Sequence, residues 1–221
     1  MLAPRHVSEN DEINNEDFAV QYDQMIRKNK KLRTMLVKEI IKFGINRGRV
    51  LEIGPGPGYL GLDWLNNTEN THLTGIDISR IMVQIAARNA REYLSMEDRA
   101  QYVYGDGQAI PFEDNSFDAV FTTSSLHEWE DPVAVLKEIN RVLKMCAPCF
   151  ISDFRRDVSG RTRWLLKTFT PKPMQSGLLA SLDAAYTKEE TTALLNQSPF
   201  KRYQLLENQF FLMIRALKSR P

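Results

Sequence analysis

The sequence contains few cysteines and histidines and no long apolar run. Only Cys146 and Cys149 carry thiols, and there are three histidines among 221 residues. Two thiols cannot form the disulfide framework of a small secreted domain, so we expect a reducing compartment such as the cytoplasm. No apolar run approaches the roughly 18 residues that a membrane-spanning helix needs. The polar N-terminal stretch also lacks the apolar segment of a secretory signal, so no integral membrane contact is predicted.

Net charge is small as well. Acidic and basic residues nearly cancel, which leaves a formal charge of +1 and predicts no nucleic-acid partner. Residues 27–49 are a local exception, with nine basic residues and one acid, Glu39. A solvated helix face explains this cluster, and an anionic partner is the alternative. The single Cys-x-x-Cys pair offers too few ligands for a zinc site, so we predict no metal and expect Cys149 to be a buried strand residue.

Strand-like and helix-like segments alternate through the middle of the chain. The length suits one domain, and 43% hydrophobic residues suit a globular protein. Such alternation predicts βαβ units and a parallel sheet. Asp131 is the expected N-cap of a helix that begins at Pro132. The predicted strands are 49–53, 72–77, 101–104, 117–122 and 148–153, and the predicted helices between them are 59–65, 79–94 and 132–143.

The two ends of the chain complete the predicted fold. Residues 18–43 have helical spacing and form one or two helices that end at Gly44, and a further helix covers 188–196. Strands at 202–207 and 210–217 are joined by a turn so short that they can pair only antiparallel. We therefore predict a doubly wound, mostly parallel seven-stranded α/β sheet of the Rossmann-like kind. Helices cover both of its faces, and an antiparallel C-terminal hairpin forms one edge.

A glycine-rich loop follows the first predicted strand directly. Gly54, Gly56 and Gly58 alternate with prolines and lead into a helix, whose N-terminus favours an anionic group. Asp77 ends the next strand, 19 residues past Gly58. A carboxylate there can accept hydrogen bonds from both hydroxyls of a ribose. The pattern predicts a site for a nucleoside-containing ligand.

The same loop leaves a second interpretation open. Gly56-x-Gly58-x-x-Gly61 satisfies the dinucleotide-binding pattern, which would suit a nicotinamide-dependent oxidoreductase. That register, however, starts two residues beyond the first glycine after the strand, and Pro57 removes an amide that a pyrophosphate could use. A protein that binds its cofactor without catalysis is a third possibility.

Further segments add a specific resemblance. In order along the chain, they resemble motifs of the class I S-adenosylmethionine-dependent methyltransferases, closest to the ubiquinone/menaquinone C-methyltransferase-like group. An N-terminal segment, 18–25, resembles the stretch that covers the cofactor in that group. The turn Met145–Cys149 departs from the Pro-Gly-Gly that usually precedes the fifth strand there. The matching segments are 50–58, 75–79, 105–118, 124–132 and 136–144.

The resemblance implies methyl transfer by in-line attack of an acceptor on the sulfonium methyl, with S-adenosylhomocysteine as product. It also implies roles for single residues. The loop amides would meet the methionine part, Glu52 its ammonium group, and Asp77 the ribose. Asp106 would accept from the adenine amino group, with a ring contact from an amide at Gly107 or Gln108. The expected cofactor-binding residues are Tyr22, Glu52, Gly54, Gly56, Asp77, Ile78, Met82, Asp106, Gly107, Gln108 and Thr123.

The acceptor side is predicted less sharply. His127 and Trp129 follow the fourth strand, where the resemblance places the substrate pocket, and His127 is the candidate catalytic residue. It could take a proton, orient the acceptor, or be merely structural. Asp153 is a possible pocket wall. Residues 155–186 mix Arg and Lys with apolar side chains, either as a cap over the acceptor or as a solvated helix packed on the sheet.

The expected organisation is a single methyltransferase domain over 1–221. Residues 1–45 would supply a tail and covering helices, 46–154 the cofactor-binding core, 155–186 the substrate cap, and 187–221 the last helix and the hairpin. The mixed character of the cap suggests a small-molecule acceptor that is partly apolar and partly anionic.

Overall fold

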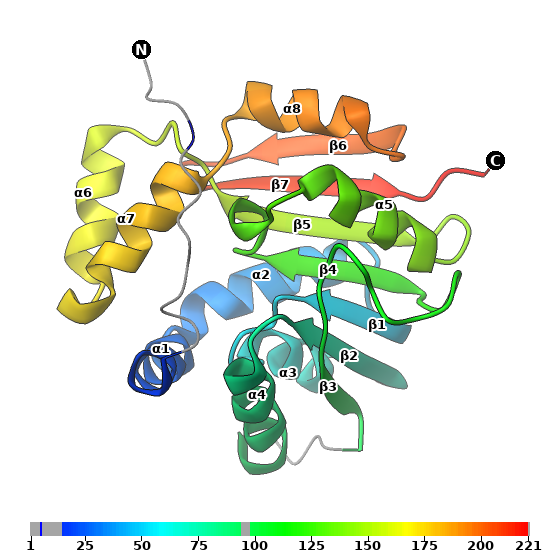
Figure 1. Ribbon diagram of the computed structural model, residues 1–221, viewed down its shortest axis with the longest axis horizontal. Helices are drawn as coiled ribbons and strands as arrows, with labels where there is room; N and C mark the ends of the chain where they lie inside the picture. The colour runs from blue at the N-terminus through cyan, green and yellow to red at the C-terminus, as the bar shows by residue number, and fades with distance from the viewer. Residues whose placement is uncertain (1–4, 6–14, 94–97, 221) are drawn as a thin grey trace.

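The fold is taken from a computed structural model that describes residues 5, 15–93 and 98–220. Within these residues one seven-stranded sheet has the order β3-β2-β1-β4-β5-β7-β6 (Figure 1). The prediction of a mostly parallel sheet is confirmed. The strands are β1 (Gly48–Ile53), β2 (Thr71–Asp77), β3 (Ala100–Tyr104), β4 (Ala119–Thr123), β5 (Pro148–Phe154), β6 (Arg202–Glu207) and β7 (Phe211–Leu217).

Strands β1 to β5 run parallel, and the C-terminal hairpin adds the antiparallel edge that the short turn predicts. It is the second hairpin strand, β7, that pairs with β5, so β6 becomes the outer strand. The fourth strand begins at Ala119 rather than at Phe117 as predicted, because Phe117 forms an isolated bridge with Leu143 instead.

Helices cover both faces of the sheet. One apolar core lies between the sheet and the helices α2 (Lys30–Lys42), α3 (Tyr59–Asn66) and α4 (Arg80–Tyr93). The other lies beneath α5 (Pro132–Val142) and α8 (Lys188–Gln197). Because helices cover both faces of the sheet, the central strands carry apolar side chains on both faces, as expected for a doubly wound sheet.

Local capping explains several helix boundaries. The Asp131 carboxylate accepts from the Ala134 amide at 3.0 Å, which confirms it as the N-cap of α5. The predicted helix 79–94 begins at Arg80, because the Ser79 hydroxyl accepts from the Met82 amide. Its predicted end at Leu94 lies outside the described residues. The N-terminal helical stretch is divided at Asn29 into α1 (Glu16–Lys28) and α2.

The segment 155–186 forms two helices at the carboxyl end of the parallel strands (Figure 1). They are α6 (Gly160–Phe169) and α7 (Gln175–Ala184), joined by the short helix η3 (Lys172–Met174). The inner helix α7 contacts η2 (Leu126–Glu128), while α6 contacts α7. This arrangement is not the packing on the sheet that the second interpretation of the segment predicted.

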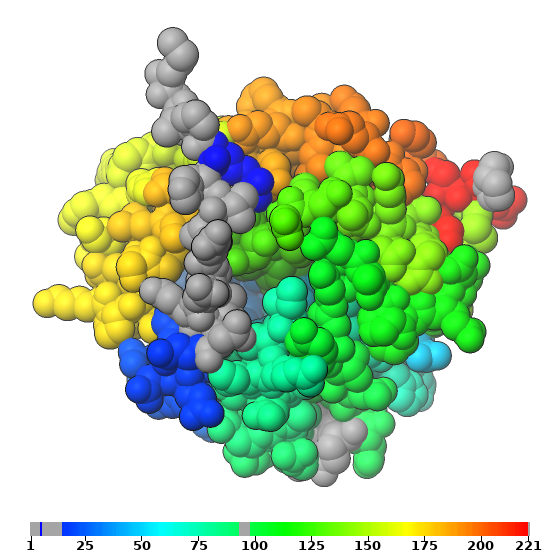
Figure 2. Space-filling view, viewed as in Figure 1, coloured from blue at the N-terminus to red at the C-terminus, as the bar shows by residue number. Residues whose placement is uncertain are grey.

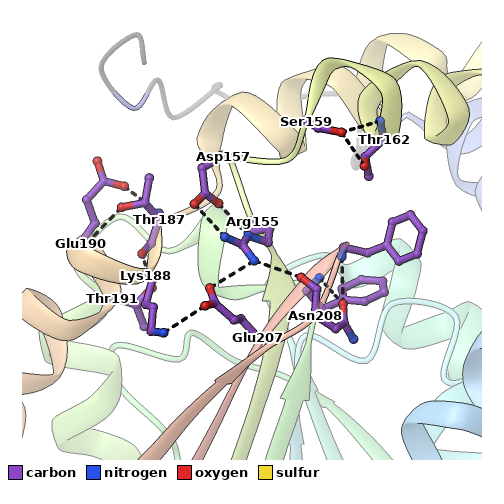
Figure 3. Close-up of polar contacts among 12 residues, drawn as sticks. Arg155, Asp157, Ser159, Thr162, Thr187, Lys188, Glu190, Thr191, Glu207 and Asn208 are labelled. Atoms are coloured by element: carbon purple, nitrogen blue, oxygen red, sulfur yellow. Dashed lines mark hydrogen bonds and ion pairs between the residues drawn. The ribbon is translucent and has the colours of Figure 1, made fainter. Parts of the chain in front are cut away.

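The first residues of this segment are anchored firmly (Figure 3). The Arg155 guanidinium donates twice to Asp157, at 2.7 and 2.8 Å, and once to the Asn208 carbonyl in the β6–β7 turn. Glu207 also pairs with both Arg155 and Lys188. The base of the insertion is therefore fixed to the hairpin and to the start of α8. Across the described residues, no helix is both long and apolar enough to cross a membrane.

Candidate functional site

The strand order reverses between β1 and β4, and in such sheets ligands bind in the crevice at the carboxyl ends of the two diverging strands. The glycine loop leaves β1 there, and the segment from Ser124 to Glu128 leaves β4 beside it. Figure 2 shows a hollow on this face between the teal residues that follow β2 and the green residues that follow β4. The predicted site residues gather around this crevice.

The glycine loop has a conformation that other residues rarely adopt. Gly54, Gly56 and Gly58 have φ angles of +64°, +52° and +83°. A Cβ atom at Gly54 would overlap the Ser125 hydroxyl. At Gly56 it would lie 3.5 Å from Cε1 of Tyr22. The missing side chain at Gly54 therefore lets the segment after β4 approach the loop backbone closely, whereas at Gly56 the positive φ angle is what favours glycine.

Asp77 joins this loop to the end of β2. Its Oδ2 accepts from the Gly56 amide at 3.0 Å, and its Oδ1 accepts from the Ser79 amide at 2.9 Å. Burial raises the pKa of Asp77, and the two backbone donors oppose that rise. A carboxylate has about four lone-pair sites, so acceptor capacity remains for the hydroxyls of a ribose. This geometry fits the role predicted for Asp77.

Of the residues predicted around the adenine, some are accessible to a ligand and one is buried. Ile78 is 63% exposed beside Asp77, as a surface that receives a ring requires. The Asp106 Oδ1 accepts from the Gln108 amide at 2.8 Å, so the Gly107 amide becomes the better candidate for a ring contact. Met82, in contrast, is buried in a small cluster with Ala19 of α1. Its predicted role as an adenine face stays a prediction.

Glu52 lies beneath the loop rather than at its surface. The residue is 2% exposed, and its Oε2 has no hydrogen-bond partner in the part of the chain that the structure describes. This oxygen occupies the space that a Cβ at Gly61 would need. Burial, together with the nearby charge of Asp77, raises the pKa of Glu52 well above its ordinary value. Its role toward the cofactor ammonium therefore stays a prediction.

Helix α1 lies against the loop through Tyr22, and its predicted covering of the cofactor stays a prediction. Burial and the charges of Glu128 and Asp77 raise the pKa of Tyr22 to about 12. Asn89 fixes the helix, because its side-chain amide donates to Asp23 at 2.8 Å and to the Pro57 carbonyl at 2.9 Å. Helix α1, helix α4 and the glycine loop are thereby held as one unit.

The segment after β4 contains a residue that the sequence reasoning missed. Thr123, the predicted cofactor residue, ends β4 half-buried. The Ser125 hydroxyl lies 3.3 Å from the Gly54 carbonyl and 3.4 Å from that of Ile53. Ser125 thus ties this segment to the glycine loop. Ser125 lies within the matching segment 124–132, but this pattern gave no sign of its partner.

His127 is not an open acceptor-facing imidazole. The residue is 3% exposed, and its Nδ1 lies 2.8 Å from Oδ1 of Asp153. The Asp153 Oδ2 also accepts from the His127 backbone amide at 2.8 Å, and the Nε2 lies 3.1 Å from Oε1 of Glu128. Asp153, predicted as a pocket wall, is instead the buried partner of the histidine.

This environment sets the protonation of His127. Burial lowers its pKa, but the charges and hydrogen bonds of Asp153 and Glu128 outweigh burial and raise the pKa to about 10. At neutral pH both ring nitrogens then carry protons and donate. Such a ring can orient a neighbour, whereas the predicted alternative of taking a proton requires a neutral imidazole.

Glu128 is the second residue that the sequence reasoning missed. Its side chain is 29% exposed, and it pairs with the buried His127 ring. It also raises the pKa values of Tyr22 and Asp77, which places its charge at the crevice. The side-chain contacts from Asp153 to His127 and from His127 to Glu128 therefore connect the end of β5 with a carboxylate beside the predicted cofactor site.

The two cysteines lie in different environments. Cys149 is buried in β5, as predicted, and burial raises the pKa of its thiol. Cys146 is exposed and has a φ angle of +62°, a left-handed conformation in the turn before β5. Among residues 5, 15–93 and 98–220 no group of His, Cys, Asp and Glu could hold a metal ion.

Comparison with known proteins finds sequence similarity to methyltransferases. A family model described as a methyltransferase domain matches residues 51–150. A methyltransferase from Bacillus subtilis, YdaC, is 32% identical over 48% of this chain and 56% of its own length. The demethylmenaquinone methyltransferase of Thermotoga maritima is 25% identical over 82% of this chain and 76% of its own length. The chain thus spans about half of the first relative and three quarters of the second.

Solved structures show the same fold over nearly the whole chain. A SAM-dependent methyltransferase from Aquifex aeolicus aligns with a TM-score of 0.71 and 21% identity, covering 93% of this chain and 99% of that one. A Methanococcus maripaludis protein assigned to the same enzymes aligns with a TM-score of 0.76 and 24% identity, covering 98% and 99%. Residues 51–150 therefore match a methyltransferase domain, and the chain has the fold of S-adenosylmethionine-dependent methyltransferases of known structure.

Proposed function

We propose that the protein transfers a methyl group from S-adenosylmethionine to a small-molecule acceptor. One observation carries the proposal: three left-handed glycines bring the loop backbone against Asp77 at the point where the strand order reverses. The cofactor would supply a methyl group activated by a positively charged sulfur. The loop amides, Asp77 and Asp106 would hold its methionine, ribose and adenine parts.

The chain's own contribution is alignment and exclusion of water. Tyr22 closes the crevice over the loop, and the Ser125 segment fixes its other wall. Glu128 would face the acceptor and accept a hydrogen bond from it. His127 and Asp153 then act as positioning residues that hold this carboxylate in place.

The class of the acceptor is proposed from two observations. The demethylmenaquinone methyltransferases among the relatives are named for demethylmenaquinone, which makes this compound a first acceptor to assay. The mixed basic and apolar composition of 155–186 suits an acceptor with apolar and anionic parts. We also propose a cytoplasmic location, supported by the scarcity of cysteine.

Mass spectrometry of the nucleoside compounds that co-purify with the protein tests the proposal. Calorimetry should then show micromolar-range binding of S-adenosylmethionine and S-adenosylhomocysteine and no measurable binding of NAD. Tight NAD binding would overturn the methyltransferase proposal. A cell extract incubated with the protein and methyl-labelled cofactor should yield a labelled acceptor.

A second candidate function has one supporting observation. The [4+2]-cyclase SpnF has the same fold, with a TM-score of 0.66 and 19% identity over 84% of this chain. This fold therefore also occurs in a protein that is named for a different reaction. Cofactor binding without any labelled product from extracts or from demethylmenaquinone would favour such a role.

A further inference from the structure

Helix α6 carries exposed aromatic side chains that fold stability does not require. Trp164 is 64% exposed and Phe169 is 83% exposed, the largest exposed fractions among the large apolar residues of the described chain. Burying such side chains removes apolar area from water, which stabilises by about 25 cal/mol per Å². Two exposed aromatic side chains on one outer helix indicate a surface that binds an apolar partner.

The charges around these side chains are mostly basic. Residues 158–182 contain four basic residues and no acid, in a chain whose net charge is only +1. Arg163 is neutralised by Asp183 at 2.9 Å. The exposed Arg161, Lys167 and Lys172 have no ion-pair partner in the part of the chain that the structure describes. We call Arg161, Trp164, Lys167, Phe169 and Lys172 the α6 surface.

The α6 surface does not belong to the cofactor crevice. Helix α7 contacts η2 beside His127, and α6 contacts α7, so α6 is the outer of the two helices (Figure 1). Arg161, Trp164 and Lys167 follow one another at three-residue intervals along one side of α6. Phe169 and Lys172 extend the same surface past the end of the helix.

We propose that the α6 surface docks the protein on an anionic lipid surface. Tryptophan and phenylalanine are the side chains that insert at the boundary between headgroups and acyl chains. Lysine and arginine beside them meet lipid phosphates and keep their charged ends in water. The firm anchoring of residues 155–157 to the β6–β7 turn would transmit this docking to the whole domain (Figure 3). No helix spans the bilayer in such an arrangement, consistent with the helices described.

A nucleic acid is the other anionic partner that the charges would suit. Phe169 decides against it, because this side chain is 83% exposed at the end of α6 and has no polar group. Insertion among acyl chains buries such a ring, whereas a phosphate backbone does not. This proposal concerns docking alone and is independent of the methyl transfer proposed above.

Vesicle binding tests the proposal directly. The full chain should sediment with vesicles of phosphatidylcholine and phosphatidylglycerol, and much less with phosphatidylcholine alone. Added salt should weaken the binding, because exposed charges are screened. The double variant Lys167→Glu with Lys172→Glu should lose at least about tenfold in affinity. The matched control, Lys42→Glu with Arg47→Glu, reverses two exposed charges before the amino end of β1 and should change affinity less than about twofold.

Tryptophan fluorescence supplies an independent readout. Trp64 and Trp129 are buried, with 0% and 8% exposed, so a spectral change on docking reports Trp164. Its emission should shift to the blue with anionic vesicles, and brominated lipid should quench it. Trp164→Phe should abolish the shift, while Phe169→Ser should weaken binding and leave thermal stability unchanged.

Several outcomes would overturn the proposal. One is a protein that does not sediment with anionic vesicles, and another is an emission of Trp164 that lipid leaves unchanged. A control variant that loses as much vesicle affinity as the double variant would be a third such outcome. Binding of RNA without binding of vesicles would assign the surface to nucleic acid. A blue shift that depends on protein concentration without lipid would assign it to a second copy of the chain.

Discussion

The glycine loop and the α6–α7 insertion lie at the same end of the sheet but are built on different principles. Around the loop, the contacts are short, buried and made largely by backbone groups, as between Gly56 and Asp77. In the insertion, the first residues, Thr162 at the start of α6 and the inner helix contact the domain, and α6 leaves Trp164 and Phe169 in solvent. A site for an invariant ligand can be fixed by backbone geometry, whereas a surface toward a variable partner depends on side chains.

The largest test of this contrast exchanges a glycine in each region. Gly54→Val should destabilise the fold by about 3 to 5 kcal/mol, because it combines a left-handed backbone with overlap of Ser125. Gly177→Ala, inside α7 and with nothing within 4 Å of a Cβ, should stabilise by about 0.5 to 1 kcal/mol. Denaturant unfolding of both variants checks the pair. Similar effects of one sign would contradict the contrast.

The next test concerns the cofactor side alone. Asp77→Ala should weaken binding of S-adenosylhomocysteine by about 1.5 to 3 kcal/mol, as expected when hydrogen bonds to a charged group are lost. Calorimetry measures this change, and Asp183→Ala in the insertion is the matched control with unchanged affinity. Wild-type affinity in a folded Asp77→Ala protein would show that the ribose lies elsewhere.

A third test measures how the free energy of unfolding depends on pH through the buried His127, which lies between the two regions. His127 has a pKa of about 10 in the folded protein, above its ordinary value of 6.5. Its contribution to stability is therefore complete below pH 6.5 and is lost as pH rises toward 10, by at most about 1.4 kcal/mol per pH unit.

Chemical unfolding of wild type and His127→Gln between pH 6 and 10 isolates this contribution. The variant should lack the part of the slope that the histidine causes. His72→Gln, at an exposed position of β2, should keep the wild-type slope. Parallel curves for wild type and His127→Gln would mean that the ring is not protonated in the fold.

The smallest expected effect lies outside both regions, in the turn before β5. Cys146 has a φ angle of +62°, which costs a residue with a side chain roughly 1 to 2 kcal/mol. Cys146→Gly should therefore stabilise by about 0.5 to 1 kcal/mol, since glycine's own entropy cost offsets part of the gain. A rise in melting temperature without a change in cofactor affinity is expected. A fall would indicate that the thiol makes a stabilising contact.

The sequence by itself determined the sheet, its antiparallel edge and the position of the glycine loop beside Asp77. Alternating apolar segments specify a parallel sheet, and the short turn between the last strands excludes any pairing but antiparallel. The glycine spacing and Asp77 act within one βαβ unit, so local pattern suffices to place them. The same holds for Asp131 as a helix cap.

Only the tertiary structure decided the chemistry of the acceptor side. His127 and Asp153 are 26 residues apart, and the sequence offered no sign that one neutralises the other. Ser125 against Gly54 and Glu128 beside Tyr22 likewise arise where β1, β4 and α1 converge. Even the first lysines and arginines after β5 differ, since Arg155 and Arg163 are paired while the exposed Lys167 has no ion-pair partner among the described residues. The physical reason is that charge pairing and burial depend on distances between segments far apart in the chain, which local pattern does not encode.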